Sequence, residues 1–180
     1  MVIGLIAGGD TALRNPVEGA EDNARKGWTE LLNHYITRRD TVVGIAESGT
    51  TPYVIHALEH CRKNNILTGS ICCNPHSPLS EKSDYPVEVV VGPEFITGST
   101  RMKSGTAQKL VLNMVSTAVM IQLGRVEDNK MVHMQLTNEK LVDRGVKMVM
   151  AQLKISDYEE ARALLIKHGS VKKLLKNYHS

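Results

Sequence analysis

The chain has 180 residues, of which 42% are apolar and 23% are charged, and its formal net charge is only +3. This composition is typical of one globular domain, and the nearly balanced charge argues against a nucleic-acid-binding surface. No apolar run is long enough to cross a bilayer, and the first residues do not resemble a signal peptide. We therefore expect a cytoplasmic protein without membrane contacts.

The cysteines are Cys61, Cys72 and Cys73, an odd number without CxxC spacing. This pattern predicts neither a disulfide framework nor a zinc site. The seven histidines form no HxH or HExxH motif. The residues therefore indicate a reduced protein without a structural metal.

Four short aliphatic runs mark the first half of the chain, and helical patterns or turns lie between them. Continuous apolar runs are typical of parallel strands that are covered on both faces. Strand–helix–strand repetition predicts an α/β fold with a doubly wound, mostly parallel sheet and flanking helices, as in flavodoxin-like proteins. We expect strands over 2–9, 41–48, 66–73 and 87–92, helices over 16–36 and 52–63, and a loop over 74–84.

The second half of the chain is predicted to be helical. Residues 104–123 are apolar nearly all round, which places this helix in the interior or at an interface. A weaker apolar stripe predicts a helix over 134–153.

The last part of the chain carries the signals of a separate helix. Ser156 and Glu159 have capping-box spacing, and Gly169 suits the helix end. We expect one domain over 1–150, followed by a short helical appendix over 151–180.

A hydroxyl-rich loop follows the second predicted strand. The stretch AESGTTP contains Ser48, Gly49, Thr50 and Thr51 directly before a helix. Ligands of open parallel sheets bind at the carboxyl ends of the strands, and a helix start there suits a phosphate. The same residues also suit an ordinary N-cap in a tight turn, and the loop alone does not decide between the two.

A second loop of the same kind precedes the apolar helix. The stretch GSTRMKSGT (98–106) combines hydroxyls and glycines with Arg101 and Lys103. Ordinary capping with surface cations would explain this loop too. Two such loops in one α/β domain nevertheless favour a phosphate ligand.

The stretch NPVEGAEDN carries three acidic residues, Glu18, Glu21 and Asp22. Acids in the first turn of a helix stabilise its dipole, which explains most such clusters. A carboxylate after the first predicted strand could also act as a general base on a sugar. The pattern alone favours the first interpretation.

Together these segments resemble the sugar isomerase (SIS) family, and within it the N-acetylmuramic acid 6-phosphate etherases, which are related to the glucokinase regulatory protein. The matching stretches occur in the order of the family and cover most of residues 2–150. They are GLIAGGDTALRNPVEGAEDN, VVGIAESGTTPYVIHAL, CCNPHSP, GPEFITGSTRMKSGTAQKLVLNM and NKMVHMQLTNEKLVDR.

The resemblance implies a lyase of peptidoglycan recycling that acts on a phosphorylated amino sugar. Such enzymes cleave the D-lactyl ether by elimination and hydration, and they need no metal or organic cofactor. The resemblance and the apolar helix over 104–123 together predict a homodimer with sites near the subunit interface.

The resemblance also assigns roles to individual residues. Glu21 matches a catalytic base of the family. The phosphate-binding loop of the family matches Ser48, Gly49, Thr50 and Thr51. A second segment that lines the site matches Glu94, Ser99, Thr100 and Lys103.

Two features depart from the family pattern. The family has a further region ahead of the stretch VIGLIAGG, with a sheet strand and a second catalytic glutamate, and we expect this chain to lack it. Glu47 stands where the family has a small residue beside the phosphate loop. Two unit charges about 5 Å apart repel by roughly 3 kcal/mol at an effective dielectric constant near 20, so Glu47 should point away from a bound phosphate.

Two other functions remain open at this stage. A non-catalytic regulator that binds a phosphosugar would retain the two hydroxyl-rich loops. An aldose–ketose phosphosugar isomerase matches the motifs less well.

Overall fold

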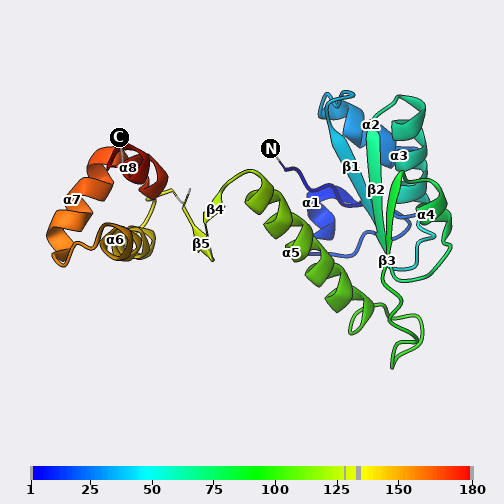
Figure 1. The fold of residues 1–180 in the computed structure, drawn as a ribbon. Coiled ribbons are helices and arrows are strands. Elements are labelled where there is room, and N and C mark those ends of the chain that lie inside the picture. Colours follow the sequence, from blue (N-terminus) through cyan, green and yellow to red (C-terminus); the bar gives the residue numbers. More distant parts are fainter. Residues whose placement is uncertain (1, 128, 133–134, 179–180) are drawn as a thin grey trace. The chain divides into compact units, whose positions relative to one another are not determined.

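The computed structural model describes residues 2–127, 129–132 and 135–178 (Figure 1). The chain divides into two compact units, Met1–Asn113 and Met114–Ser180. Each unit is described by itself. The expected division into a phosphosugar-binding domain over 1–150 and an appendix over 151–180 stays a prediction.

A parallel sheet of three strands forms the centre of the first unit. The strands are β1 (Thr41–Ile45), β2 (Leu67–Cys72) and β3 (Tyr85–Glu88), in the order β1–β2–β3. Figure 1 shows them side by side, with their arrowheads at one edge of the sheet. The α/β fold with a parallel sheet and flanking helices is therefore confirmed.

Helices α3 (Pro52–Lys63) and α4 (Pro78–Glu81) pack against this sheet, and α2 (Lys26–Asn33) packs against α3. The predicted helix over 52–63 is confirmed, with its proline in the first turn. Leu58 of α3 is fully buried in a core that also contains Ala46, Cys72 and Leu79. This core fixes the start of α3 relative to the ends of β1 and β2.

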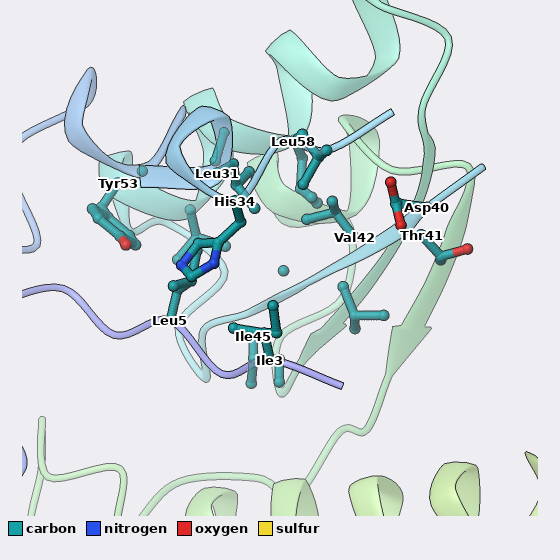
Figure 2. Close-up of a pocket in the computed structure, with 16 residues that line it drawn as sticks. Ile3, Leu5, Leu31, His34, Asp40, Thr41, Val42, Ile45, Tyr53 and Leu58 are labelled. Carbon is teal, nitrogen blue, oxygen red and sulfur yellow. The ribbon is translucent and has the colours of Figure 1, made fainter. Parts of the chain in front are cut away.

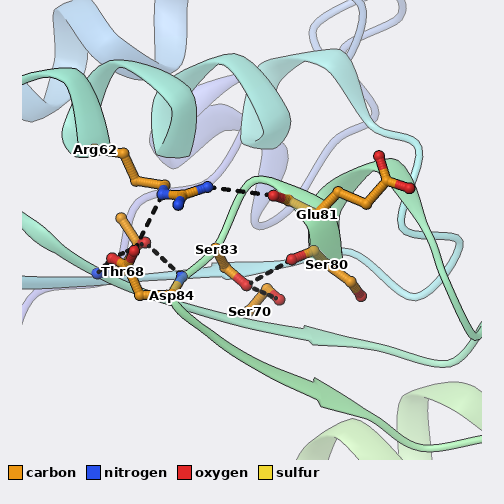
Figure 3. Close-up of polar contacts among 7 residues, drawn as sticks. All are labelled: Arg62, Thr68, Ser70, Ser80, Glu81, Ser83 and Asp84. Carbon is orange, nitrogen blue, oxygen red and sulfur yellow. Dashed lines mark hydrogen bonds and ion pairs between the residues drawn. The ribbon is translucent and has the colours of Figure 1, made fainter.

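The connection between β2 and β3 is held by polar contacts (Figure 3). Arg62 Nε lies 3.1 Å from an oxygen of Asp84. The other oxygen of Asp84 accepts hydrogen bonds from the amide and the hydroxyl of Thr68, at 3.0 and 2.7 Å. The hydroxyls of Ser70 and Ser83 are buried and lie 2.7 Å apart. These contacts order the chain as it enters β3.

The predicted strand over 2–9 is wrong. Residues 2–6 have no regular secondary structure, and α1 (Gly9–Ala12) begins within the expected strand. Gly8 and Gly9 have positive φ angles of 89° and 64°, and the Gly9 amide donates to the Ile6 carbonyl. This turn ends the apolar run, residues 2–6 pair with no described strand, and β1 lies at an edge of the three-stranded sheet.

Three other boundaries differ from expectation. The predicted helix over 16–36 begins only at Lys26, after a series of turns in which Gly19 has a φ angle of 70°. The predicted strand over 87–92 is β3, which ends at Glu88. The expected loop over 74–84 contains the short helix α4, capped by the Ser77 hydroxyl.

Helix α5 (Ser104–Gln122) forms as predicted. Of its two expected positions, the interior of the chain is excluded by the exposure of its side chains, and the interface stays a prediction. Only Ser104 and Val111 are buried, while Leu110 is 53% exposed and Met114 is 62% exposed. An apolar sequence does not itself supply a covering surface. Despite this apolar character, none of the described helices is both long and apolar enough to span a bilayer.

The described residues of the second unit form two antiparallel strands, the second half of α5 and three further helices. Asn138 caps α6, so the predicted helix over 134–153 begins later than expected, and residue 134 lies outside the described residues. The cap of α7 is Asp157, whose carboxylate accepts from the Glu160 amide, and not Ser156. Gly169 ends this helix with a φ angle of 72°, as predicted. The elements are β4 (Val126–Glu127), β5 (Lys130–Met131), α6 (Glu139–Leu153), α7 (Tyr158–His168) and α8 (Val171–Tyr178).

Candidate functional site

The candidate site lies where the strands of the first unit end. Backbone pairing between β1 and β2 continues past both strands: the Ala46 amide donates to the Ile71 carbonyl at 3.1 Å, and the Cys73 amide donates to the Glu47 carbonyl at 2.9 Å. The loops that follow β1 and β2 therefore run together at the carboxyl edge of the sheet. This edge is where open α/β sheets bind ligands.

The loop over 48–51 is anchored to the loop after β2. Gly49 has a φ angle of 72°, and a Cβ atom there would lie 2.3 Å from the Ser77 Cβ. The Gly49 carbonyl accepts from the Leu79 amide at 3.0 Å, and the Ser48 carbonyl accepts from the Asn74 side chain at 3.1 Å. Glycine is therefore required at position 49 both by the backbone angle and by the space.

The hydroxyls of this loop differ in what they bind. The Ser48 hydroxyl oxygen accepts from the Thr50 amide at 3.2 Å and from the Thr50 hydroxyl at 3.0 Å. Thr51 is the N-cap residue of α3, but its side chain makes no capping hydrogen bond. The hydrogen bonds of an ordinary turn thus account for the hydroxyls of Ser48 and Thr50. The Thr51 hydroxyl, in contrast, does not cap the helix.

The acidic stretch over 18–22 reaches the start of α3. The Glu21 carbonyl accepts a hydrogen bond of 3.0 Å from the Tyr53 amide, which is the first N–H of α3 because Pro52 has none. The carboxylate side chain of Glu21 is exposed. This contact brings Glu21 to the same helix start as Thr51.

Glu94 binds the start of α5. Its carboxylate accepts from the amides of Lys103 and Ser104, each at 3.0 Å, while the Lys103 ammonium donates to the Pro93 carbonyl at 2.8 Å. The bond from the Ser104 amide is the main reason why the pKa of Glu94 is lowered. The amides of Lys103 and Ser104 lie in the second hydroxyl-rich loop, where the sequence favours a phosphate ligand. In the structure, these two amides bind the Glu94 carboxylate instead.

A cavity of about 210 Å³ lies at this edge of the sheet. Two predicted site residues, Glu94 and Thr100, line it, whereas the 48–51 loop, Ser99 and Lys103 do not. The lining consists of residues that follow all three strands: Glu47, Cys73, Asn74, Val91, Gly92, Pro93, Glu94, Thr97, Gly98, Thr100 and Ser104.

The sequence interpretation did not select five polar lining residues as site residues. They are Glu47, Cys73, Asn74, Thr97 and Ser104. Asn74 directly follows the predicted strand over 66–73, and Glu47 lies at the end of the predicted strand over 41–48. The rule that ligands bind at strand ends could therefore have identified both residues. Thr97 and Ser104 are brought to the cavity only by the path of the chain from β3 to α5.

The surroundings of Cys73 disfavour a reactive thiolate. Burial raises the pKa of its thiol, and the nearby carboxylates of Glu47 and Glu94 raise it further. A thiol with a raised pKa is protonated at neutral pH, and the thiolate is the reactive form. The thiol lies 3.8 Å from the Ser104 carbonyl and contributes to the cavity wall.

A larger cavity of about 350 Å³ lies along β1 (Figure 2). Its lining is mostly aliphatic and includes Ile3, Leu5, Leu31, Val42 and Leu58. None of the predicted site residues lines it. We interpret this cavity as apolar surface at the open edge of the sheet and not as a catalytic or ligand-binding site.

Within the described part of the chain, no three His, Cys, Asp or Glu side chains are grouped so that they could hold a metal ion. The three cysteines are free and buried. The polar groups of the candidate site are therefore hydroxyls, backbone amides, one carboxamide and carboxylates. These groups suit a small polar ligand with both an anionic and a hydroxyl-bearing part.

Parallel strands with hydroxyl-rich loops at their carboxyl ends are typical of α/β proteins that bind small ligands at that edge. The SIS domain family model matches residues 27–118, and the chain belongs to this family. This result confirms the resemblance seen in the sequence motifs.

Relatives of this chain have the name N-acetylmuramic acid 6-phosphate etherase. The protein from Bacteroides thetaiotaomicron is 62% identical over 178 residues, which are 99% of this chain and 64% of that protein. The protein from Porphyromonas gingivalis is 64% identical over 171 residues, 95% of this chain and 62% of its own length. The protein from Cronobacter sakazakii is 53% identical over 165 residues, which are 92% of this chain and 55% of that protein. This chain thus spans less than two thirds of these relatives.

Glu94→Gln should lower the melting temperature by a few degrees at neutral pH, because the neutral amide is a weaker acceptor for the Lys103 and Ser104 amides. The folded pKa of Glu94 lies below the ordinary value of 4.5, so its contribution is present above that value and is lost as the pH falls through the folded pKa. Thermal unfolding across acid and neutral pH measures the difference. The difference in melting temperature between Glu94→Gln and the unsubstituted chain should shrink in acid. If it does not, or if Glu18→Gln lowers the melting temperature equally, Glu94 does not stabilise the start of α5 in this way.

Gly49→Ala should lower the free energy of unfolding by at least about 2 kcal/mol, because the new methyl group meets Ser77 and the φ angle is positive. Gly9→Ala is the matched control, since Gly9 also has a positive φ angle but no atom within 4 Å of an added Cβ. The control should cost only about 1 kcal/mol. Urea unfolding of both variants tests this, and equal losses would show that the contact with Ser77 is unimportant.

Proposed function

We propose that this chain carries the sugar-phosphate site of an N-acetylmuramic acid 6-phosphate etherase and the base that begins its reaction. The relatives above, at 53–64% identity, support this assignment. The ligand is a phosphorylated amino sugar, with its phosphate at the 48–51 loop and its carbon skeleton towards Glu21. Glu94, Ser99, Thr100 and Lys103 belong to the second segment around the ligand. The expected cytoplasmic location stays a prediction.

The proposed reaction needs an acidic proton beside the ether. In the open-chain sugar, the C1 aldehyde makes the C2 proton acidic, and the Glu21 carboxylate removes it. The electron pair forms the C2–C3 double bond while the C3–O bond breaks. The departing lactyl oxygen takes up a proton from water, and Glu21 returns the proton it removed to the solvent, so that D-lactate is released. Water then adds its hydroxyl to C3 and a proton to C2, which gives N-acetylglucosamine 6-phosphate. No redox step is involved.

One contact supports this arrangement above all others. The hydrogen bond from the Tyr53 amide to the Glu21 carbonyl ties the acidic stretch to the helix start that carries Thr51. A ligand held by the N-terminal end of α3 is therefore within reach of the same segment. The helix dipole favours an anion at this end.

Glu21→Gln should lower the rate of D-lactate release from N-acetylmuramic acid 6-phosphate by about 100-fold or more, which is the usual contribution of a general base. Binding of N-acetylglucosamine 6-phosphate should change little, because Gln keeps the shape of the side chain and the backbone contact. A coupled assay of D-lactate and calorimetric titration measure the two quantities. Glu18→Gln, in the same exposed stretch, is the control.

The outcomes separate the three candidate functions. Lactate release that persists in Glu21→Gln would overturn the role of Glu21. Binding of the phosphosugar without lactate release from the unsubstituted chain would favour a regulator. Interconversion of an aldose and a ketose phosphate would favour an isomerase.

We further propose that two copies of this chain associate through α5. Exposed apolar side chains on this helix, including Leu110, Val115, Val119 and Ile121, support an interface. The resemblance to the family predicts ligand-binding sites near the subunit interface, and an interface at α5 would agree with this prediction.

Leu110→Glu should convert a dimer into a monomer, because it places a charge in the apolar contact. Lys109→Glu changes the neighbouring exposed position and should leave the dimer intact. Sedimentation velocity measures the state of each variant. A monomeric unsubstituted chain, or a dimer that Leu110→Glu does not alter, would contradict this interface.

A further inference from the structure

Glu47 is a carboxylate that departs from the family pattern and that the proposed reaction does not use. It follows the buried Ala46, two residues after the end of β1, and lines the 210 Å³ cavity. Its backbone is fixed by the 2.9 Å hydrogen bond that its carbonyl accepts from the Cys73 amide. Its side chain is partly buried, so the carboxylate is held at the wall of the cavity.

The two carboxylates of the cavity differ in what they bind. Glu94 accepts hydrogen bonds from the backbone amides of Lys103 and Ser104, so its carboxylate already has partners within the chain. Among the described residues, the Glu47 side chain makes neither a hydrogen bond nor an ion pair. Its oxygens are therefore available to donors from outside the chain. Each carboxylate oxygen can accept two hydrogen bonds.

The charge of the cavity decides which part of a ligand fits. No Lys or Arg is among the described residues that line it, and Glu47 and Glu94 both carry negative charge. A phosphate in this cavity would therefore meet two carboxylates, and the neighbouring Lys103 ammonium is already bound to the Pro93 carbonyl at 2.8 Å. Hydroxyl groups and amide N–H groups would instead find acceptors at Glu47 and partners at Thr97 and Thr100.

We propose that Glu47 is a specificity-determining residue that accepts hydrogen bonds from the hydroxyl or N-acetyl N–H groups of the sugar. This inference rests on the proposed function, since it assumes a phosphorylated amino sugar at this site. Glu47 orients the ligand: its neutral, donor-rich part enters the cavity, and its phosphate remains at the start of α3 near Thr51. The carboxylate also disfavours ligands that bring a second anion into the cavity.

Calorimetric titration of the full chain with two probes tests this role. The probes are N-acetylglucosamine 6-phosphate, which has both parts, and inorganic phosphate, which has only one. Glu47→Gln should weaken binding of the sugar phosphate by about tenfold or more, as expected for hydrogen bonds to a charged acceptor. Its affinity for inorganic phosphate should be unchanged or higher, because a nearby anion has been removed.

Two further variants make the result specific. Glu81→Gln removes an exposed carboxylate of the same unit that does not line the cavity, and it should bind both probes like the unsubstituted chain. Glu47→Asp keeps the charge but withdraws it by one methylene, and its affinity for the sugar phosphate should fall between that of the unsubstituted chain and that of Glu47→Gln. Thermal unfolding confirms that each variant is folded.

The outcomes distinguish this inference from the proposed function. Equal affinity of Glu47→Gln and the unsubstituted chain for the sugar phosphate would overturn it, and so would an equal loss for both probes. If the unsubstituted chain binds the sugar phosphate but releases no lactate, the etherase proposal fails and the binding comparison still decides the role of Glu47. If the unsubstituted chain binds neither probe, both proposals fail.

Discussion

The parallel pairing of β1 with β2 is the constraint on which the candidate site depends. The pairing runs in register from Thr41 opposite Leu67 to Ile45 opposite Ile71, and two more backbone bonds extend it past the strands. Because both strands point the same way, the loops after them must leave at one edge. The contact of Gly49 with Ser77 then closes these loops against each other, so that the start of α3 and the cavity wall are fixed by the same few hydrogen bonds.

Negative charge at this edge is divided among three carboxylates with different surroundings. Glu94 is bound to backbone amides and stabilises the start of α5. Glu47 faces the cavity, and Glu21 is exposed beside the start of α3. In the proposed arrangement, the phosphate binds away from the cavity, at the positive dipole end of α3, and the neutral donors of the ligand bind at Glu47.

Among the described residues, apolar surface remains uncovered beside β1 and along α5. The cavity along β1 lies at the open edge of the sheet, and α5 exposes aliphatic side chains along most of its length. Burial of apolar area is the main favourable term in folding and association, so surfaces of this kind favour covering by further protein. For α5, this argument supports the proposed contact between two copies.

The sequence by itself determined the fold class, the helix over 52–63 and the family, because continuous apolar runs, a first-turn proline and long motifs are local signals. It failed where the outcome depends on distant partners. The apolar run over 2–9 is typical of a strand, yet residues 2–6 pair with no strand among the described residues. Only the tertiary structure assigned Glu94 to the start of α5 and Glu47 to the cavity, since these roles depend on which loops meet at the edge of the sheet.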